Sequence, residues 1–369
     1  MRKIRVLIVD DSTVIRMMLS NALSSDAEIE VASVAANGKI ALAKIPQLNP
    51  DVITLDMEMP EMDGITTLTE IRKLYPKLPV IMFSTLTQRG AEATLDALSR
   101  GANDYVTKPA NVGSVTVAMQ SVRDELVPKI KANCNWYTKG SFASPGPKPT
   151  RPTTQSRPMP ARPARSAPID IVAIGSSTGG PNALSAVLSA LPADFSIPIV
   201  ISQHMPPIFT KHLADRLNQQ CSLTVREGVA GDELLPGTVT IAPGDFHMVV
   251  ERKGTQMLIG LNKGTPENSC RPAVDVMLRS VAQIYRQNAL VVILTGMGQD
   301  GKSGSELVRA MGGRVFAQDE ATSVVWGMPG AVVNAGLADL VAPLTGIAQE
   351  VVRECAAGRA PRTLQKIGS

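Results

Sequence analysis

Long hydrophobic runs are absent from this chain of 369 residues. No stretch approaches the roughly 18 consecutive apolar residues that a membrane-spanning helix requires. The N-terminal apolar run, residues 4–9, is too short for the core of a signal peptide and is closed by the acidic pair Asp10 and Asp11. We therefore expect a cytoplasmic protein that is not embedded in a membrane.

Cysteine is scarce and is not arranged for bridging or for metal binding. The chain has four cysteines, Cys134, Cys221, Cys270 and Cys355, and no two of them form a CxxC pair. This spacing supports neither a disulfide framework nor a zinc site, so we expect ordinary thiols.

Acidic residues are missing from residues 140–168, which contain five basic residues and eight prolines among 29 residues. This composition is typical of an extended linker that separates two domains, and a basic docking arm is the alternative. Because the net charge of the whole chain is only +4, these five charges leave the remainder close to neutral. The charge therefore gives no indication of a nucleic-acid partner.

Short apolar segments alternate with amphipathic ones on both sides of this linker. Strands are predicted at 5–9, 29–34, 52–55, 80–83 and 104–106, and again at 169–174, 197–201, 239–241, 290–294 and 314–317. Helical periodicity occupies intervening stretches such as 14–23, 65–74, 209–218 and 273–285. Alternation of this kind predicts two α/β domains, each with a doubly wound parallel sheet.

Chemically active side chains follow the strands of the first half, at the ends where such sheets bind ligands. They are Asp10 and Asp11, Asp56, Ser84 and Lys108. Converging carboxylates repel each other unless a cation lies among them, and oxygen ligands suit Mg²⁺. A hydroxyl and a lysine nearby would contact a phosphoryl group carried by one carboxylate. The pattern therefore indicates a phosphoacceptor site.

The first 122 residues resemble the response-regulator receiver domain, through LIVDDS at 7–12, TLDMEMPEMDG at 54–64, MFST at 82–85 and GANDYVTKP at 101–109. The resemblance implies a flavodoxin-like fold in which Asp56 is phosphorylated. It implies a Mg²⁺ site formed by Asp10, Asp11, Asp56 and the carbonyl of Glu58. It also implies that Ser84 and Lys108 contact the phosphoryl group. Tyr105 would be the switch aromatic.

A serine lies on a glycine-rich turn in the second half, in the run GSSTGG at 175–180 between a predicted strand and a predicted helix. Ser177 occupies the serine position of a G-x-S-x-G pattern, whose tight turn exposes the hydroxyl beside backbone N–H groups that can hold an oxyanion. The motif alone is also typical of a phosphate-binding turn. In its context it indicates acyl transfer.

The general base for such a serine should be one of only three histidines in the chain. His204 follows a predicted strand and would lie at the same sheet edge as Ser177. His247 also follows a strand and is the second candidate, whereas His212 lies on an amphipathic helical stretch.

The carboxylate that orients the imidazole should also follow a strand. Asp300 does so in the segment TGMGQDG, and Asp275 and Asp319 are less well placed. The resulting order along the chain is Ser, His, Asp. Because α/β-hydrolases have the order Ser, acid, His, the G-x-S-x-G match does not imply that fold.

The segment 168–358 resembles the catalytic domain of the chemotaxis protein-glutamate methylesterases, the CheB family. The resemblance is carried by IGSSTGGPNAL, SQHMPP, IAPGDFHM, RPAVDVML, ILTGMGQDG and WGMPG. It implies that Ser177, His204 and Asp300 form a catalytic triad, with Met297 beside it.

Two positions depart from the family pattern. Ser176 stands where family members often have Ala, so two adjacent serines compete for the role of nucleophile, and the motif register favours Ser177. Cys270 stands where many members carry His. A catalytic thiol at Cys270 is the minor alternative, because no histidine is tied to it in the sequence.

The two resemblances imply a receiver, a linker at 123–167, a methylesterase domain and a tail at 359–369. The family hydrolyses glutamate γ-methyl esters on methyl-accepting chemoreceptors, releasing methanol, and deamidates certain receptor glutamines. The phosphodonor is the histidine kinase CheA, Mg²⁺ binds in the receiver, and the catalytic domain uses no cofactor. We expect a monomer in which the unphosphorylated receiver restrains the esterase.

Three other classes of function fit parts of the sequence less well. A non-catalytic, phosphorylation-controlled adaptor would not need the Ser, His and Asp set. A transcription factor would need a helix-turn-helix or basic recognition helix, which is missing after residue 168. A dinucleotide-binding turn would need G-x-G-x-x-G spacing, which the run GSSTGG lacks.

Overall fold

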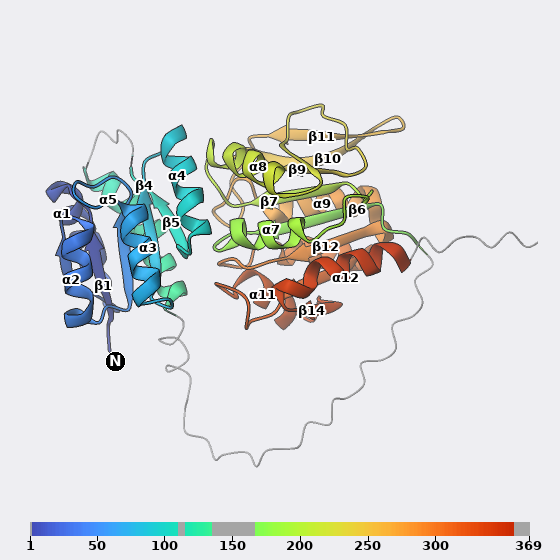
Figure 1. Ribbon diagram of the computed structural model, residues 1–369. Coiled ribbons are helices and arrows are strands. Elements are labelled where there is room, and N and C mark those ends of the chain that lie inside the picture. The colour runs from blue at the N-terminus through green and yellow to red at the C-terminus, as the bar shows by residue number, and fades with distance from the viewer. Residues whose placement is uncertain (1, 110–114, 135–166, 358–369) are drawn as a thin grey trace, which may run out of the picture.

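The protein is described by a computed structural model that covers residues 2–109, 115–134 and 167–357 (Figure 1). The Pro-rich part of the predicted linker and the predicted tail at 359–369 lie outside the described residues. Two α/β domains lie side by side, and we call the described parts before and after the linker the first and second domains (Figure 1).

Five parallel strands form the sheet of the first domain, in the order β2-β1-β3-β4-β5. They are β1 (Ile4–Val9), β2 (Ile29–Ala35), β3 (Val52–Asp56), β4 (Val80–Ser84) and β5 (Asp104–Thr107). The helices are α1 (Thr13–Ser24), α2 (Gly38–Leu48), α3 (Gly64–Leu74), α4 (Gln88–Ser99) and α5 (Val115–Asn133). The doubly wound parallel fold predicted from the alternation is confirmed.

Polar side chains start four of these helices soon after a strand ends. The capping residues Ser12, Asn37, Asp63 and Thr87 each accept a hydrogen bond from a backbone N–H in the first turn of the helix that follows. Such caps satisfy N–H groups that have no partner within the helix. They keep the loops at the carboxyl edge of the sheet compact, and this is the edge that carries the predicted phosphoacceptor site.

The predicted domain boundary at residue 122 falls inside α5, which continues to Asn133. Leu126 and Ile130 are fully buried and belong to the same apolar cluster as residues of α1 and β1. Because these side chains complete the core of the first domain, the segment up to Asn133 belongs to that domain and not to the linker.

Seven parallel strands form the sheet of the second domain, in the order β14-β13-β12-β6-β7-β9-β8. They are β6 (Ile171–Ser176), β7 (Ile199–Gln203), β8 (Thr224–Glu227), β9 (Thr238–Ile241), β12 (Ala289–Ile293), β13 (Arg314–Gln318) and β14 (Leu340–Ala342). This sheet confirms the second predicted α/β domain.

The main helices of the second domain are α7 (Gly180–Ser189), α8 (Phe209–Gln220), α9 (Val274–Tyr285), α10 (Lys302–Ala310), α11 (Met328–Asn334) and α12 (Leu344–Ala357). An antiparallel hairpin of β10 (His247–Lys253) and β11 (Gln256–Asn262) forms a separate two-stranded sheet. The alternation of strands and helices did not predict this hairpin, because it interrupts the βα repeat.

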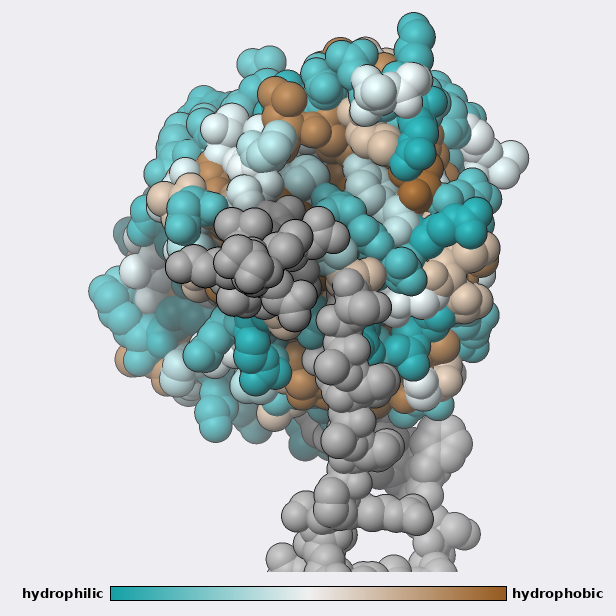
Figure 2. All heavy atoms as spheres, turned by 90° about the vertical axis from the view of Figure 1, so that its right-hand side faces the viewer, coloured by the Kyte–Doolittle hydropathy of each residue, from teal (hydrophilic) through white to brown (hydrophobic). Residues whose placement is uncertain are grey.

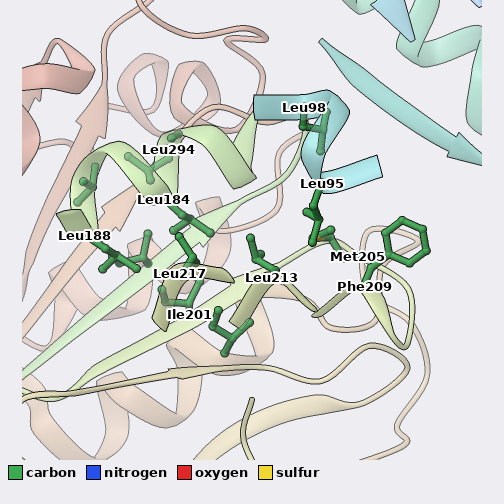
Figure 3. Close-up of a cluster of buried hydrophobic side chains, with 14 of the residues drawn as sticks. Leu95, Leu98, Leu184, Leu188, Ile201, Met205, Phe209, Leu213, Leu217 and Leu294 are labelled. Carbon is green, nitrogen blue, oxygen red and sulfur yellow. The ribbon is translucent and has the colours of Figure 1, made fainter. Parts of the chain in front are cut away.

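Apolar side chains join the two domains. Figure 3 shows Leu95 of α4 beside Met205 and Leu213 of the second domain, and all three belong to one buried cluster. The ring of Tyr105 on β5 stacks on Phe209 at the start of α8, with centroids 5.0 Å apart and planes 7° from parallel. Aromatic and aliphatic contacts of this kind exclude water from the interface.

The end of the second domain that points away from the first is mostly hydrophilic, with hydrophobic residues in small separate groups (Figure 2). Single apolar residues are common on protein surfaces and mark no site by themselves. Among the described residues, no helix is both long enough and apolar enough to span a bilayer.

Candidate functional site

Ser177 follows directly after β6, on the turn that leads into α7. Gly179 has a left-handed backbone with φ 76°, and Pro181 lies in the first turn of α7. A left-handed residue followed by proline ends the strand and starts the helix within a few residues. The backbone N–H of Ser177 donates to Thr295 O at 3.1 Å, so the turn is held against the loop after β12.

The hydroxyl of the neighbouring Ser176 is already engaged. Ser176 is fully buried, and its Oγ donates to Oε1 of Gln203 at 2.7 Å. Gln203 Nε2 in turn donates to the carbonyl of Ser177 at 2.9 Å. A Cβ at Gly180 would lie 1.9 Å from Gln203 Oε1, so only glycine leaves room for this contact. Of the two adjacent serines, Ser177 is the one whose side chain is free to meet a substrate.

His204 and Asp300 lie on the loops on either side of Ser177. Since β6 lies between β12 and β7 in the sheet, the segments that follow these three strands meet at one edge. His204 Nε2 and Asp300 Oδ2 are 2.7 Å apart. The backbone N–H of His204 donates to Ser176 O at 3.1 Å, which fixes the histidine beside the serine turn.

The carboxylate of Asp300 is almost completely buried and accepts hydrogen bonds from several N–H groups. Backbone N–H groups of Val274, Asp275 and Gly301 donate to it at 2.6, 2.9 and 2.9 Å respectively. Burial alone would raise the pKa of Asp300, but the hydrogen bond with His204 and those from the backbone outweigh it and lower that pKa. Asp300 is therefore held as an anion on the imidazole.

The second imidazole nitrogen of His204 faces a thiol. Cys270 Sγ lies 3.3 Å from His204 Nδ1, and no hydrogen bond joins Ser177 Oγ to His204 within the described part of the chain. Burial by itself would lower the pKa of His204, but the contacts with Asp300 and Cys270 outweigh it and raise the pKa to about 9. The sequence had tied no histidine to Cys270, and the structure ties it to His204.

Replacing Cys270 with alanine is expected to lower the pKa of His204 from about 9, because one of the contacts that raises it is lost. NMR titration of the imidazole protons measures this directly, and only three histidines must be assigned. Cys221→Ala is the matched control, since Cys221 contacts Ser189 and not a histidine. An unchanged titration in Cys270→Ala would contradict the assignment of this contact.

The other predicted alternatives lie elsewhere. His247 is buried, with Nε2 3.0 Å from Thr265 O and Nδ1 accepting from Ala273 N at 3.2 Å, so it supports loops. Asp319 accepts hydrogen bonds from Thr322, away from His204.

A cavity of about 1010 Å³ opens at the serine and is lined by both domains. Ser177, His204 and Met297 lie on one side of it, and Tyr105 and Lys129 lie on the side formed by the first domain. The cavity is large enough for a side chain of another protein, and its rim includes the first domain.

The first domain also contacts the residue next to Ser177. Thr178 Oγ1 donates to Asp104 Oδ2 at 2.7 Å, and both side chains are buried. Nearby, Asn182 Nδ2 donates to Leu98 O at 2.7 Å. A change at the start of β5 is thereby coupled to the serine turn through a direct hydrogen bond, which sequence reasoning did not reveal.

Three acidic residues meet at the carboxyl edge of the first sheet. One carboxylate oxygen each from Asp10, Asp11 and Asp56 lies within 4.8 Å of the others. Lys108 Nζ lies 2.7 Å from Asp56 Oδ1, and Asp56 Oδ2 is buried without a hydrogen-bond partner among the described residues. An unpartnered oxygen in a cluster of carboxylates is the donor set that Mg²⁺ prefers. The residues therefore fit a magnesium ion.

Of the other residues predicted for this site, Glu58 lies beside Asp56, whereas the Ser84 hydroxyl points to a backbone carbonyl. Glu58 and Asp56 line the same cavity of about 680 Å³. Ser84 is buried and donates to Gly90 O at 3.1 Å, so in this conformation its hydroxyl points to a backbone carbonyl. Burial, followed by the charge of Asp10, raises the pKa of Asp56 to about 6 in spite of Lys108.

Comparison with known families matches both domains. The family described as CheB methylesterase matches residues 172–351, and the response regulator receiver domain matches residues 6–120. The chain is 52% identical over 353 residues to a protein-glutamate methylesterase/protein-glutamine glutaminase of Trichodesmium erythraeum (strain IMS101), which covers 96% of this chain and 99% of the relative. A protein with the same name from Nocardioides sp. (strain ATCC BAA-499 / JS614) is 50% identical over 360 residues, covering 96% of each.

A solved structure matches the second domain. The crystal structure of the Thermotoga maritima CheB methylesterase catalytic domain aligns with a TM-score of 0.50 and 46% identity, covering 50% of this chain and 98% of that one. With both family matches in the same chain and relatives similar over nearly their whole length, this chain belongs to the CheB family, which joins a receiver domain to a protein-glutamate methylesterase domain.

Proposed function

We propose that this chain hydrolyses glutamate γ-methyl esters on chemoreceptors under the control of phosphorylation, and deamidates receptor glutamines at the same site. The observation that carries the proposal is the placement of Ser177 between the loops of His204 and Asp300, open to a cavity of about 1010 Å³. An ester and a primary amide of the same acid differ by one acyl substituent, so one nucleophile can act on both.

In the proposed mechanism, Ser177 Oγ attacks the acyl carbon and His204 Nδ1 takes its proton. Asp300 holds the proton on Nε2, which leaves Nδ1 as the basic nitrogen. His204 then protonates the departing methanol or ammonia, and water, activated by the same histidine, hydrolyses the acyl-serine. Cys270 must leave Nδ1 before this can happen.

Backbone N–H groups of the serine turn are proposed to stabilise the oxyanion. The N–H groups of Ser177 and Gly180 are already bonded to Thr295 O and Ser177 O. By contrast, those of Thr178 and Gly179 make no backbone hydrogen bond within the described residues. The residue after a nucleophilic serine commonly donates to the oxyanion, so Thr178 is the favoured donor.

The receiver domain is proposed to accept a phosphoryl group on Asp56 from the histidine kinase CheA, in the cytoplasm and in a monomeric protein. Asp10, Asp11, Asp56 and the carbonyl of Glu58 would hold Mg²⁺, which supplies positive charge to the phosphoryl oxygens when bound. Lys108 already lies against Asp56, and Ser84 would turn from Gly90 O toward the phosphoryl group.

The docked receiver is proposed to restrain the esterase. Asp104 accepts the hydrogen bond from Thr178, and Tyr105 and Lys129 form part of the cavity wall where a receptor helix would enter. Phosphorylation of Asp56, at the carboxyl edge of the sheet, would favour a second arrangement of β5, whose first residue is Asp104, and release these contacts. Residues 168–369 alone should then hydrolyse esters faster than the unphosphorylated full chain.

Methanol release from radiolabelled, methylated receptor membranes tests the proposal. With the full chain, release is expected to rise when Mg²⁺ and a small-molecule phosphodonor are added, and EDTA is expected to remove the rise. Asp56→Asn should keep the basal rate and lose the rise, whereas Asp26→Asn, at the opposite edge of the sheet, should keep both. No release by the wild-type chain under either condition would favour the adaptor function instead.

A further inference from the structure

A two-residue hairpin at 267–270 lies against the acid side of the serine site. Glu267 and Cys270 exchange both backbone hydrogen bonds, at 3.1 and 2.8 Å. The two residues between them, Asn268 and Ser269, have left-handed backbones with φ 50° and 61°. Positive φ at both central positions is the geometry of a type I′ turn, which favours Asn at the first of them.

The Asn268 side chain reaches from this turn to two buried carboxylates. Its Nδ2 lies 3.1 Å from Asp275 Oδ2 and 3.1 Å from Asp300 Oδ1. Asp275 and Asp300 are 4% and 1% exposed. Since an amide nitrogen carries two hydrogens, this single group can donate to both acids at once. These hydrogen bonds offset part of the repulsion between two like charges that lie close together in a medium of low dielectric constant.

The turn is anchored at both of its ends. Glu267 forms a two-point ion pair with Arg279 of α9, one pair of atoms lying 2.9 Å apart. At the other end Cys270 contacts His204 Nδ1. One short hairpin therefore touches both members of the histidine–aspartate pair, and its position is set by α9.

We infer that Asn268 is a positioning residue for the esterase reaction, which holds Asp300 in the orientation that presents Oδ2 to His204 by donating to Asp300 and Asp275 together. The inference rests on the proposed function. Asn268 acts through Asp300, and its own chemistry takes no part in the reaction. Asp275 contributes as the second anchor, because its other oxygen accepts from the backbone N–H of Gly304 at 2.6 Å.

The charges around this bridge make it sensitive to pH. Arg279 of α9 and Glu267 of the hairpin face Asp275 and Asp300 from one side, His204 and Cys270 lie beyond Asp300, and α10 contributes a backbone N–H. Burial, with the charge of Asp300, raises the pKa of Asp275 to about 6. A further carboxylate in place of the amide would add a third negative charge to this group.

Three full-length variants test the inference without straining the turn. Asn268→Gly removes the amide and tolerates positive φ, and Ser269→Gly does the same to the neighbouring side chain as the matched control. We expect Asn268→Gly to lower kcat for methanol release about 10- to 100-fold with little change in KM, because the acid is misplaced. Ser269→Gly should retain the wild-type kcat.

Asn268→Asp keeps a residue suited to the turn and replaces the donor with an acceptor. Its activity relative to wild type should rise as the pH falls, because protonation lets the new carboxyl donate a hydrogen bond. A kcat for Asn268→Gly within twofold of wild type, or a pH profile of Asn268→Asp parallel to that of wild type, would overturn the inference.

The titration of His204 by NMR separates this inference from the proposed function. Asn268→Asp should raise the pKa of His204 by adding a negative charge, and Ser269→Gly should not. This change is expected even if no methyl ester is hydrolysed, in which case the proposed function fails and the positioning role stands. If Asn268→Asp hydrolyses the ester normally and the titration of His204 does not change, the proposed function stands and the positioning role of Asn268 fails.

Discussion

Replacing Ser177 with alanine is expected to reduce methanol release to background, a loss of about 10⁴- to 10⁶-fold in kcat, because the variant lacks the hydroxyl proposed to form the acyl intermediate. Ser177 is exposed to the cavity at the end of β6, and His204 lies on the next loop. The assay is methanol release by the full chain with Mg²⁺ and phosphodonor, beside circular dichroism to verify folding.

Ser176→Ala is the matched control for this prediction. Its hydroxyl is buried on Gln203, so its removal should lower the rate by no more than about tenfold, through a small shift of the turn. If Ser176→Ala lost all activity and Ser177→Ala retained it, Ser176 and not Ser177 would be the nucleophile. Activity retained in both variants, together with loss in Cys270→Ala, would favour the thiol alternative.

Replacing Asp300 with asparagine is expected to lower kcat by about 10³- to 10⁴-fold. The amide can donate to His204, which allows the imidazole to hold its proton on Nδ1 and so deprives Ser177 of its base. The variant should also lower the pKa of His204 from about 9, because the anion that raises it is gone. Rates and imidazole titration are both measured.

The stability of Asp300→Asn must be measured as well, because Asp300 has a structural task. Ala273 starts α9 without a side-chain cap, and Asp300 accepts the N–H groups of Val274 and Asp275 in its place. Asp319→Asn is the matched control, since Asp319 caps a loop away from the site. A rate for Asp300→Asn within tenfold of wild type would contradict the assignment of Asp300 as the orienting acid.

Much of the serine site could be predicted because parallel sheets have a simple rule. The segments that follow neighbouring parallel strands meet at one edge, so a serine, a histidine and an aspartate that each follow a strand are brought together by the topology. The sheet order β12-β6-β7 places Ser177 between His204 and Asp300 in this way. The same rule applies to Asp10, Asp56 and Lys108 in the first sheet.

Other contacts could not be predicted, because they join segments that no repeating pattern relates. Asn268 and Cys270 lie on a short turn outside the parallel sheet, and their partners depend on where α9 holds that turn. Ser84 follows its strand as expected but points to Gly90 O, since a buried hydroxyl takes whichever acceptor lies nearest.

By itself, the sequence determined two doubly wound domains, the glycine-rich turn with Ser177, and the strand ends that carry the acids and His204. These follow from local periodicity and from backbone preferences, which act over a few residues. Only the tertiary structure decided that the Ser176 hydroxyl bonds to Gln203 and that Asp104 bonds to Thr178. It also decided that the Cys270 thiol contacts Nδ1 of His204, the proposed base. Such contacts depend on packing between distant segments, where a displacement of one ångström makes or breaks a hydrogen bond.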